Sequence, residues 1–232
     1  YLLPNGWEWC KLEDIVSFGG GKTPAMDNKE YWHNGNHLWV TSKDMKCSHI
    51  TNSLMKITDK ALEIMTIYER GTLLVVTRSG ILRHTLPISI LETPATVNQD
   101  LKAISPHIKD LSEYLYIVIK ANEHFILKEY HKDGTTVDSI DFDKFKCLPI
   151  PLAPITEQRR IIAETKLLLI KSKIKFCLLP FTVNSFLKTR MMSQHQNCSS
   201  ASIRKLRLLV ITRIIHSYLK DGQLLPCKYY VL

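Results

Sequence analysis

The stretch from residue 147 to residue 162 sets the sharpest boundary in this chain of 232 residues. A proline fixes φ and holds the residue before it in extended geometry, and this stretch has three, Pro149, Pro151 and Pro154. Thr156 is a good N-cap, and Glu157 places a negative charge in the first turn, where the helix dipole favours it. No proline or glycine follows between Glu157 and Leu179. The sequence therefore predicts that a compact unit ends here and a long helix begins.

The chain before this boundary mixes strand and helix patterns. β-Branched runs bounded by turn formers predict four strands, at residues 37–41, 72–77, 88–91 and 101–104. Apolar residues at helical spacing predict a helix over residues 110–130. We expect an amphipathic entry segment over residues 7–18, a loop at Gly19–Gly21 and a half-solvated strand over residues 139–145. Because strands and helices do not alternate strictly, the expected fold class is α+β.

Charge is distributed unevenly along the chain, whose net charge is +9. Residues 1–165 contain 19 Lys and Arg against 21 Asp and Glu, whereas residues 166–232 contain 12 basic residues and a single acid, Asp221. The isoelectric point of about 9.2 therefore comes from the C-terminal part. A DNA-binding surface before residue 165 would have to be a local basic patch.

The sequence contains no constellation that supports catalysis. A P-loop needs a glycine at the position of Val16, so Phe18–Thr23 predicts a turn that could contact phosphate or simply be a surface turn. The three acids Asp138, Asp141 and Asp143 could suggest magnesium, but the alternating pattern around them fits a strand better. There is no nucleophile elbow of the Gly-x-Ser-x-Gly kind. These absences favour a binding subunit over an enzyme.

Metal, membrane and secretion signals are absent from the sequence as well. The six cysteines are scattered without a C-x-x-C pair, so no zinc site is expected and a reducing, cytoplasmic compartment is the default. His33 and His37 are separated by turn residues and lack an acidic third ligand. No apolar run is long enough to span a membrane, and the start shows no signal peptide.

Several short landmarks follow one another in the order typical of one protein family. They are Leu3-Pro4-Asn5-Gly6-Trp7, Gly20-Gly21-Lys22-Thr23-Pro24, Asn98-Gln99-Asp100, Gly134-Thr135-Thr136-Val137-Asp138 and the 147–162 boundary. Together they resemble a target recognition domain and the start of the helical spacer that follows it in specificity (S) subunits of type I restriction-modification systems. The resemblance stops soon after residue 170.

The resemblance implies a domain plan. Residues 1–152 would form the target recognition domain, with a twisted, mostly antiparallel sheet and packed helices, and residues 153–176 would begin the conserved spacer helix. Residues 177–232 form an atypical basic tail, which is either a frameshifted or truncated end or a real basic amphipathic helix. The chain would thus be a half or truncated subunit with a single recognition domain.

By the same resemblance, the chain is a non-catalytic subunit that recognises a specific duplex DNA sequence. It would position methyltransferase (M) and restriction (R) subunits on a bipartite site and needs no cofactor or membrane. A second specificity half-subunit could pair with it through the spacer helix, but the tail favours weak or absent dimerisation. The open alternatives are a degenerate non-functional remnant, a stand-alone basic protein whose tail binds nucleic acid or a membrane, and an enzyme fused to a recognition module.

Candidate contact residues follow from position and chemistry. Arginine reads guanine best in the major groove, and lysines and hydroxyls in polar loops suit phosphates and base edges. The candidate DNA contacts are Lys22, Thr23, Lys43, Arg78, Ser79, Arg83, Lys132, Thr135 and Thr136, each of which could also be plain solvated surface. Asn98 and Gln99 are expected to tie down a turn. A heptad-like stripe that could face a partner helix comprises Ile161, Ile162, Leu168 and Leu169. The tryptophans are expected to be core and strand anchors: Trp7, Trp9, Trp32 and Trp39.

Overall fold

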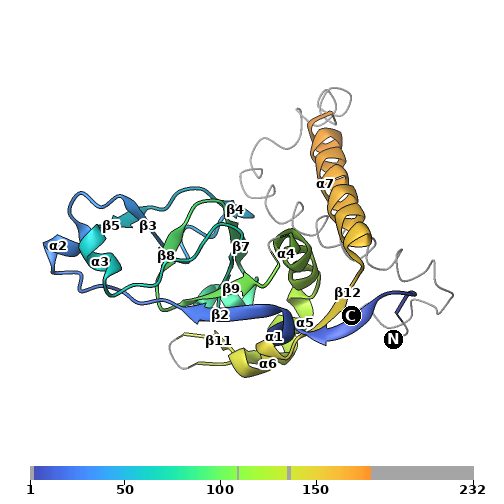
Figure 1. Cartoon of the computed structure of the whole chain (residues 1–232), viewed down its shortest axis with the longest axis horizontal. Coiled ribbons are helices and arrows are strands. Elements are labelled where there is room, and N and C mark those ends of the chain that lie inside the picture. Colours follow the sequence, from blue (N-terminus) through green and yellow to red (C-terminus); the bar gives the residue numbers. More distant parts are fainter. Residues whose placement is uncertain (1–2, 109, 135–136, 179–232) are drawn as a thin grey trace, which may run out of the picture. The chain divides into compact units, whose positions relative to one another are not determined.

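A computed structural model describes residues 3–108, 110–134 and 137–178 of the chain (Figure 1). The chain divides into two compact units. The larger unit runs from Trp9 to Leu152, and the smaller combines Tyr1–Glu8 with Ala153–Leu232. The basic tail expected over residues 177–232 lies outside the described residues from residue 179 onward. Within the described part, no helix is both long and apolar enough to cross a membrane.

A five-stranded sheet forms the centre of the larger unit. In spatial order its strands are β2 (Val16–Gly20), β9 (Leu101–Pro106), β6 (Leu73–Val76), β7 (Ile88–Leu91) and β4 (His49–Ile50). Every neighbouring pair is antiparallel except β4 and β7. All residues of β6 and β7 are buried, which explains why Ser89 is their only polar residue; its hydroxyl donates to the Cys47 carbonyl at 2.6 Å. The strands expected at 72–77, 88–91 and 101–104 are confirmed.

Three smaller sheets complete the strand content of the described residues. A three-stranded sheet has the order β5 (Met55–Ile57), β3 (His37–Val40), β8 (Ala95–Val97), with β3 antiparallel to β5 and parallel to β8. The strand expected at 37–41 is thus confirmed. The two-stranded sheets pair β1 (Glu8–Lys11) with β12 (Pro149–Leu152) and β10 (His131–Lys132) with β11 (Ser139–Ile140).

Short helices connect and cover the strands of the larger unit, and one long helix, α7, belongs to the smaller unit. Their bounds are α1 Leu12–Ile15, α2 Lys29–Trp32, α3 Asp59–Leu62, the 3-10 helix η1 Gly80–Arg83, α4 Leu111–Ala121, α5 Glu123–Glu129, α6 Phe142–Lys146 and α7 Ile155–Leu178. Helix α4 lies beside β7 (Figure 1). It buries Leu111, Leu115, Val118 and Ile119, a spacing of three and four that places them on one face. The mixed sheets and packed helices confirm the α+β class.

A second, smaller apolar cluster lies between α2, α3 and the three-stranded sheet. Trp39, Ile57 and Ala61 are buried in it, and the ring of Trp32 meets that of Trp39 edge-on at 5.0 Å. The core-anchor prediction is therefore confirmed for Trp39 and Trp32. It is wrong for Trp9, which is 49% exposed on β1.

Two local predictions are wrong because side chains make bonds that periodicity does not reveal. The segment 139–145 is not a strand: β11 ends at Ile140, and the Asp141 carboxylate accepts the Lys144 N–H at 3.3 Å to start α6. The segment 110–130 is two helices rather than one. Asn122 separates them, and its side-chain amide donates to the Val118 carbonyl at 2.9 Å.

The two other differences concern strand and helix ends. Gly19 and Gly20 belong to β2 rather than to a loop, and the Tyr68 hydroxyl donates to the Gly20 carbonyl at 2.6 Å. Helix α7 begins at Ile155, so Thr156 lies in its first turn and is not the N-cap. The Pro154 carbonyl accepts the Gln158 N–H at 2.9 Å, which closes that turn earlier than expected.

We predict that Gly21→Ala destabilises the larger unit by about 1–3 kcal/mol, the usual cost of overpacking a well-packed site. A Cβ at this position would overlap the carbonyl oxygens of Val97 and Asn98, which are backbone atoms and cannot rotate away. Gly80→Ala is the matched control, since no atom lies within 4 Å of its Cβ position. Urea denaturation of the two variants measures the difference. Equal midpoints would contradict this account of the β8–β9 turn.

Candidate nucleic-acid interface

The loops that carry most of the predicted DNA contacts leave the sheets at one end. Gly20, the last residue of β2, pairs with Lys102 near the start of β9, and Val76, the last residue of β6, pairs with Leu101. In the other sheet, Val40 and Val97 are paired at the ends of β3 and β8. The segments that follow β2, β3, β6 and β8 therefore emerge together. These segments and the nearby β10–β11 hairpin carry seven of the predicted contacts. We call this group of residues the strand-end surface: Lys22, Thr23, Lys43, Arg78, Ser79, Arg83 and Lys132.

Residues 97–100 connect these loops by hydrogen bonds. The Lys22 N–H donates to the Val97 carbonyl at 3.1 Å, and the Thr77 N–H donates to the Asp100 carbonyl at 2.9 Å. The Asn98 N–H donates to the Val40 carbonyl at 3.0 Å, which anchors the loop that carries Lys43.

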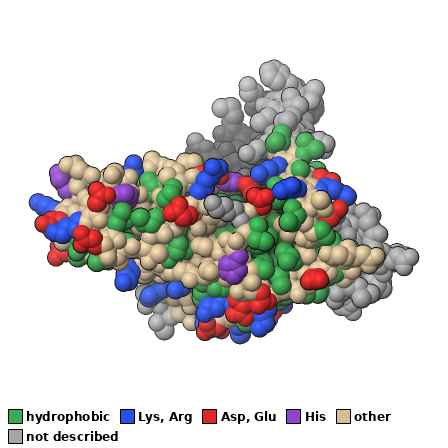
Figure 2. Space-filling view, viewed as in Figure 1, with side chains coloured by type: hydrophobic (Ala, Val, Ile, Leu, Met, Phe, Trp, Pro, Cys, Tyr) green, Lys and Arg blue, Asp and Glu red, His purple; other side chains and the backbone are tan. Residues whose placement is uncertain are grey.

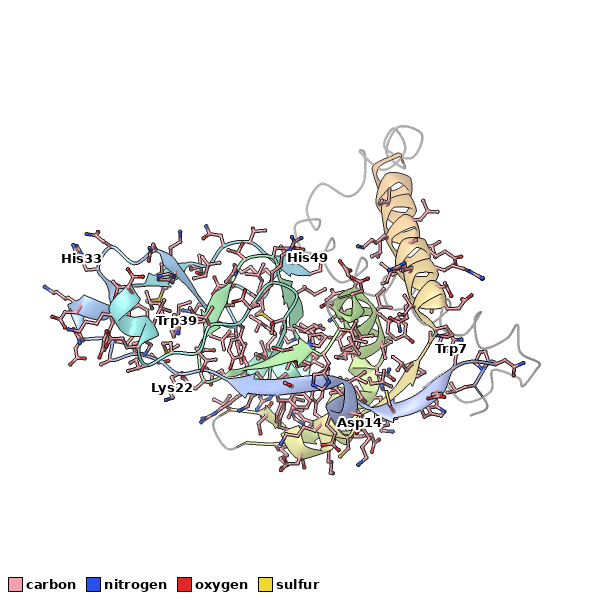
Figure 3. The ribbon with its side chains drawn as sticks, in the orientation of Figure 1. Trp7, Asp14, Lys22, His33, Trp39 and His49 are labelled. Carbon is pink, nitrogen blue, oxygen red and sulfur yellow. The ribbon has the colours of Figure 1, made fainter. Side chains whose placement is uncertain are left out.

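Side chains reinforce the same turn. The Thr23 hydroxyl donates to the Gln99 side chain, and the Asn98 amide donates to the Asp100 carboxylate at 3.2 Å. These bonds are what we expect of residues that tie down a turn. Thr23 is therefore partly engaged within the protein. Figure 3 shows Lys22 just beyond the end of β2, where its carbonyl accepts the Trp39 indole N–H at 3.1 Å.

The β10–β11 hairpin joins the surface beside Arg78. The Ser79 N–H donates to the Asp138 carbonyl at 3.0 Å, and the Ile140 N–H donates to the Thr77 carbonyl at 2.9 Å. Arg78 also forms a backbone bridge with Ser139. Backbone hydrogen bonds thus join two segments some 60 residues apart in sequence, 77–79 and 138–140. The predicted contacts Thr135 and Thr136 lie outside the described residues.

Arg83 is held by a buried carboxylate. Its Nε lies 2.6 Å from Asp138 Oδ2 and its Nη2 lies 3.3 Å from Oδ1, and the Asp138 side chain is 1% exposed. The Gly134 N–H donates to Oδ1 at 3.4 Å, and His131 Nε2 lies 3.5 Å from Oδ2. The hydrogen bond with Arg83 is the main cause that lowers the pKa of Asp138, and the same bond raises the pKa of Arg83. Arg83 therefore joins η1 to the hairpin through its Nε and Nη2.

The three clustered aspartates each have a basic partner of their own. Asp138 pairs with Arg83, Asp141 with Lys132 at 3.0 Å, and Asp143 with Lys146 at 3.1 Å. His131, Asp133 and Asp138 place possible ligand atoms within 4.8 Å of one another. However, Asp133 is 98% exposed and Arg83 occupies the Asp138 carboxylate, so we assign no metal to this group.

The remaining predicted contacts differ in how free their charges are. Lys22, Lys43 and Arg78 are exposed, and their side chains form no ion pair among the described residues. Lys132 is 59% exposed and forms an ion pair with Asp141. Its hydrogen bond to Asp141 lowers the pKa of that carboxyl group. Arg78 is thus the arginine of the surface whose guanidinium is available to a ligand.

The predicted partner-helix stripe lies on one face of α7. Ile161 is 4% exposed, and Ile162, Leu168 and Leu169 are half-buried. Leu167 and Ile170 were not predicted, yet they are 49% and 53% exposed. Their positions do not follow the heptad spacing, so the heptad pattern does not predict them.

This α+β domain gathers basic and hydroxyl side chains at one end of its sheets, an arrangement suited to contact with an anionic ligand. The chain belongs to the family of type I restriction modification DNA specificity domains, whose profile matches residues 4–165. It is 36% identical over 157 residues to the specificity subunit of the type I restriction enzyme EcoR124I/EcoR124II of Escherichia coli, covering 67% of this chain and 39% of that protein. It is 32% identical over 167 residues to the MjaIX specificity subunit of Methanocaldococcus jannaschii, covering 68% and 37%.

Solved structures show the same fold. The HsdS subunit from Thermoanaerobacter tengcongensis superposes with a TM-score of 0.54 at 19% identity, covering 92% of this chain and 46% of that one. A chain from a study of complex assembly and conformational transition of the type I R-M system gives a TM-score of 0.55 at 20% identity, with 92% and 47% covered. The chain therefore spans about two fifths of the curated relatives and under half of these structures.

We predict that Asp138→Asn removes a pH-dependent part of the stability of the larger unit. Because the pKa of Asp138 lies below its usual 3.8 in the folded chain, its ionised form stabilises the fold above that value. This contribution is lost as the pH falls through the folded-state pKa. The wild type should therefore have a larger free energy of unfolding than the variant. This difference should be constant near neutral pH and shrink below about pH 4.

Chemical denaturation at several pH values measures this difference. Asp27→Asn is the control, because Asp27 is an exposed turn residue outside the hairpin contacts. A difference that stays constant down to pH 2 for Asp138→Asn would contradict the pairing with Arg83.

Proposed function

We propose that this chain recognises a short duplex DNA sequence through the strand-end surface. The observation that carries the proposal is the convergence of four loops that are distant in sequence. They bring Lys22, Lys43 and Arg78, which form no ion pair within the described part of the chain, to the end of the sheets where the hairpin docks. This local basic edge belongs to a part of the chain that is nearly neutral as a whole, so its position reflects folding rather than overall composition. The family and the curated relatives, all specificity subunits, support the proposal.

The roles within the surface follow from chemistry. Arg78 is the candidate base reader, because a free guanidinium can donate two hydrogen bonds to guanine O6 and N7. Lys22, Lys43 and Lys132 suit phosphates, which set register without reading sequence. Arg83 acts through Asp138 and keeps the hairpin in place.

The chain would act as a non-catalytic member of a larger assembly. We propose that it positions methyltransferase and restriction subunits on DNA, that the catalytic steps belong to those subunits, and that it works in the cytoplasm. Helix α7 would supply the partner contact through Ile162, Leu168 and Leu169, since these apolar side chains are only half-buried. A second specificity half-subunit could bind the same face.

We predict that Arg78→Ala weakens binding of the preferred duplex by about 1–3 kcal/mol and relaxes selectivity at one base position. The preferred duplex is obtained by selection from a randomised pool with the wild-type chain, and affinities are measured at fixed salt. Arg70→Ala is the matched control. Arg70 is 74% exposed, pairs with Glu92 and precedes the first residue of β6, at the end of that strand away from Arg78.

The outcomes separate the possibilities. If the affinity falls equally for all sequences, and the slope of log affinity against log salt concentration becomes smaller by about 0.9, Arg78 is a phosphate contact. No change in affinity would remove Arg78 from the interface. Failure of the wild type to select any sequence would contradict the proposed function and favour a degenerate remnant.

We also predict that the chain alone is monomeric at micromolar concentration. The resemblance to the spacer helix stops near residue 170, so the apolar stripe available for pairing is about two heptads, too short for a stable coiled coil. Size-exclusion chromatography with light scattering measures the mass. A clean dimer at this concentration would contradict the prediction.

A further inference from the structure

Two lysines that the sequence patterns did not single out surround one aromatic ring beside the strand-end surface. Lys102 Nζ of β9 lies 5.4 Å from the centroid of the Phe142 ring, and Lys146 Nζ of α6 lies 5.3 Å from it. The ring itself is fixed by its neighbours. Phe18 of β2 meets it edge-on at 5.3 Å, and Phe145, which is 1% exposed, stacks on it at 5.9 Å. We call Lys102, Phe142 and Lys146 the aromatic–lysine patch.

The charges of this patch are poorly neutralised. Lys102 has no carboxylate partner among the described residues, and the partner of Lys146, Asp143, is 91% exposed and therefore contributes little. The face of an aromatic ring attracts an ammonium group but leaves N–H donors free for an anion. Two cations held at one ring thus form a surface that favours an anionic ligand.

The patch is continuous with the strand-end surface. Lys102 pairs with Gly20 across the edge of the sheet, and a Cβ on Gly20 would lie 3.2 Å from Lys102 Nζ. A glycine at this position therefore lets the ammonium group lie close over β2, two residues before Lys22. On the other side, Lys132 binds Asp141, the residue directly before Phe142. In Figure 2, basic side chains lie along the lower edge of the molecule, below the position that β2 occupies in Figure 1. Acidic side chains gather beside them.

The spacing suits duplex DNA. Lys102 pairs with Val75 of β6, three residues before Arg78. Strand β6 ends at Val76, and Arg78 lies in the extended segment directly after it, where three residues cover about 10 Å at a rise of ~3.3 Å each. At about 3.4 Å per base pair, this corresponds to roughly three base pairs along the duplex axis. A phosphate bound at the patch would therefore flank bases read by Arg78.

We infer that Lys102 and Lys146, held over Phe142, form a second contact for the phosphate backbone of duplex DNA and fix its register on the strand-end surface. The inference rests on the proposed function and assigns it a contact outside the predicted loops. The contact is with phosphate, so it adds affinity for every sequence and selectivity for none.

The test compares the wild-type chain with Lys102→Gln, Lys146→Gln and the double variant, because glutamine keeps most of the apolar stem and removes the charge. The probes are the preferred duplex and a scrambled duplex, titrated across a range of salt concentrations. Each lysine that contacts phosphate should lower the log–log salt slope by about 0.9 when it is removed. Both duplexes should lose affinity by the same factor. Lys56→Gln is the control, because Lys56 is an exposed strand lysine on β5.

Phe142→Leu tests the ring itself, since it keeps an apolar side chain against Phe145 and removes the cation–π contact. It should weaken both duplexes equally and by less than the double lysine variant does. Circular dichroism and urea denaturation verify that each variant folds.

Two outcomes would overturn the inference. One is an unchanged salt slope in the double variant while the wild type still selects a duplex, and the other is a loss confined to one sequence. A wild-type chain that binds neither duplex would instead contradict the proposed function.

Discussion

The hydrogen bonds of residues 97–100 are the constraint on which the rest of the larger unit depends. This short turn runs from the end of β8 in one sheet directly into β9 in the other. It forms hydrogen bonds with the last residue of β3 and with residues just after β2 and β6. Because backbone donors and acceptors must be satisfied when buried, the turn fixes where each of those loops starts. The polar side chains at the strand end are therefore placed by main-chain geometry, which leaves their own identities free to vary.

The second support is the ion pair between Arg83 and Asp138. It joins η1 to the β10–β11 hairpin with a carboxylate that is almost fully buried, and such a pair is costly to break from one side. Because of this pair, two arginines close in sequence have different roles. Arg83 is committed to structure, whereas Arg78 remains available to a ligand. A nearly neutral domain can in this way present a local positive edge suited to the anionic backbone of DNA.

Much of this fold follows from the sequence, and the failures have identifiable causes. The β-branched runs of β3, β6 and β7 and the apolar spacing of α4 are local signals, so they predicted their elements well. The break at Asn122 and the start of α6 at Asp141 depend on single side-chain bonds, and the early start of α7 depends on one backbone bond, none of which periodicity registers. The partners of Arg83 and Lys102 lie 55 and 40 positions away in sequence, so only the folded chain brings them together. The landmark residues Asn98 and Gln99 identified the family because they build the turn, and for that reason they say little about the DNA sequence read.

Hydrogen–deuterium exchange with and without the preferred duplex tests the central claim most directly, because it reports on the whole domain without a substitution. The account predicts slower exchange on DNA binding in residues 20–24, 41–45, 77–83, 97–102, 131–134 and 137–142. It predicts no change in residues 69–72 and 91–94, which lie at the opposite end of β6 and β7. Protection confined to that opposite end, or to α7, would contradict the assignment of the DNA interface to the strand-end surface.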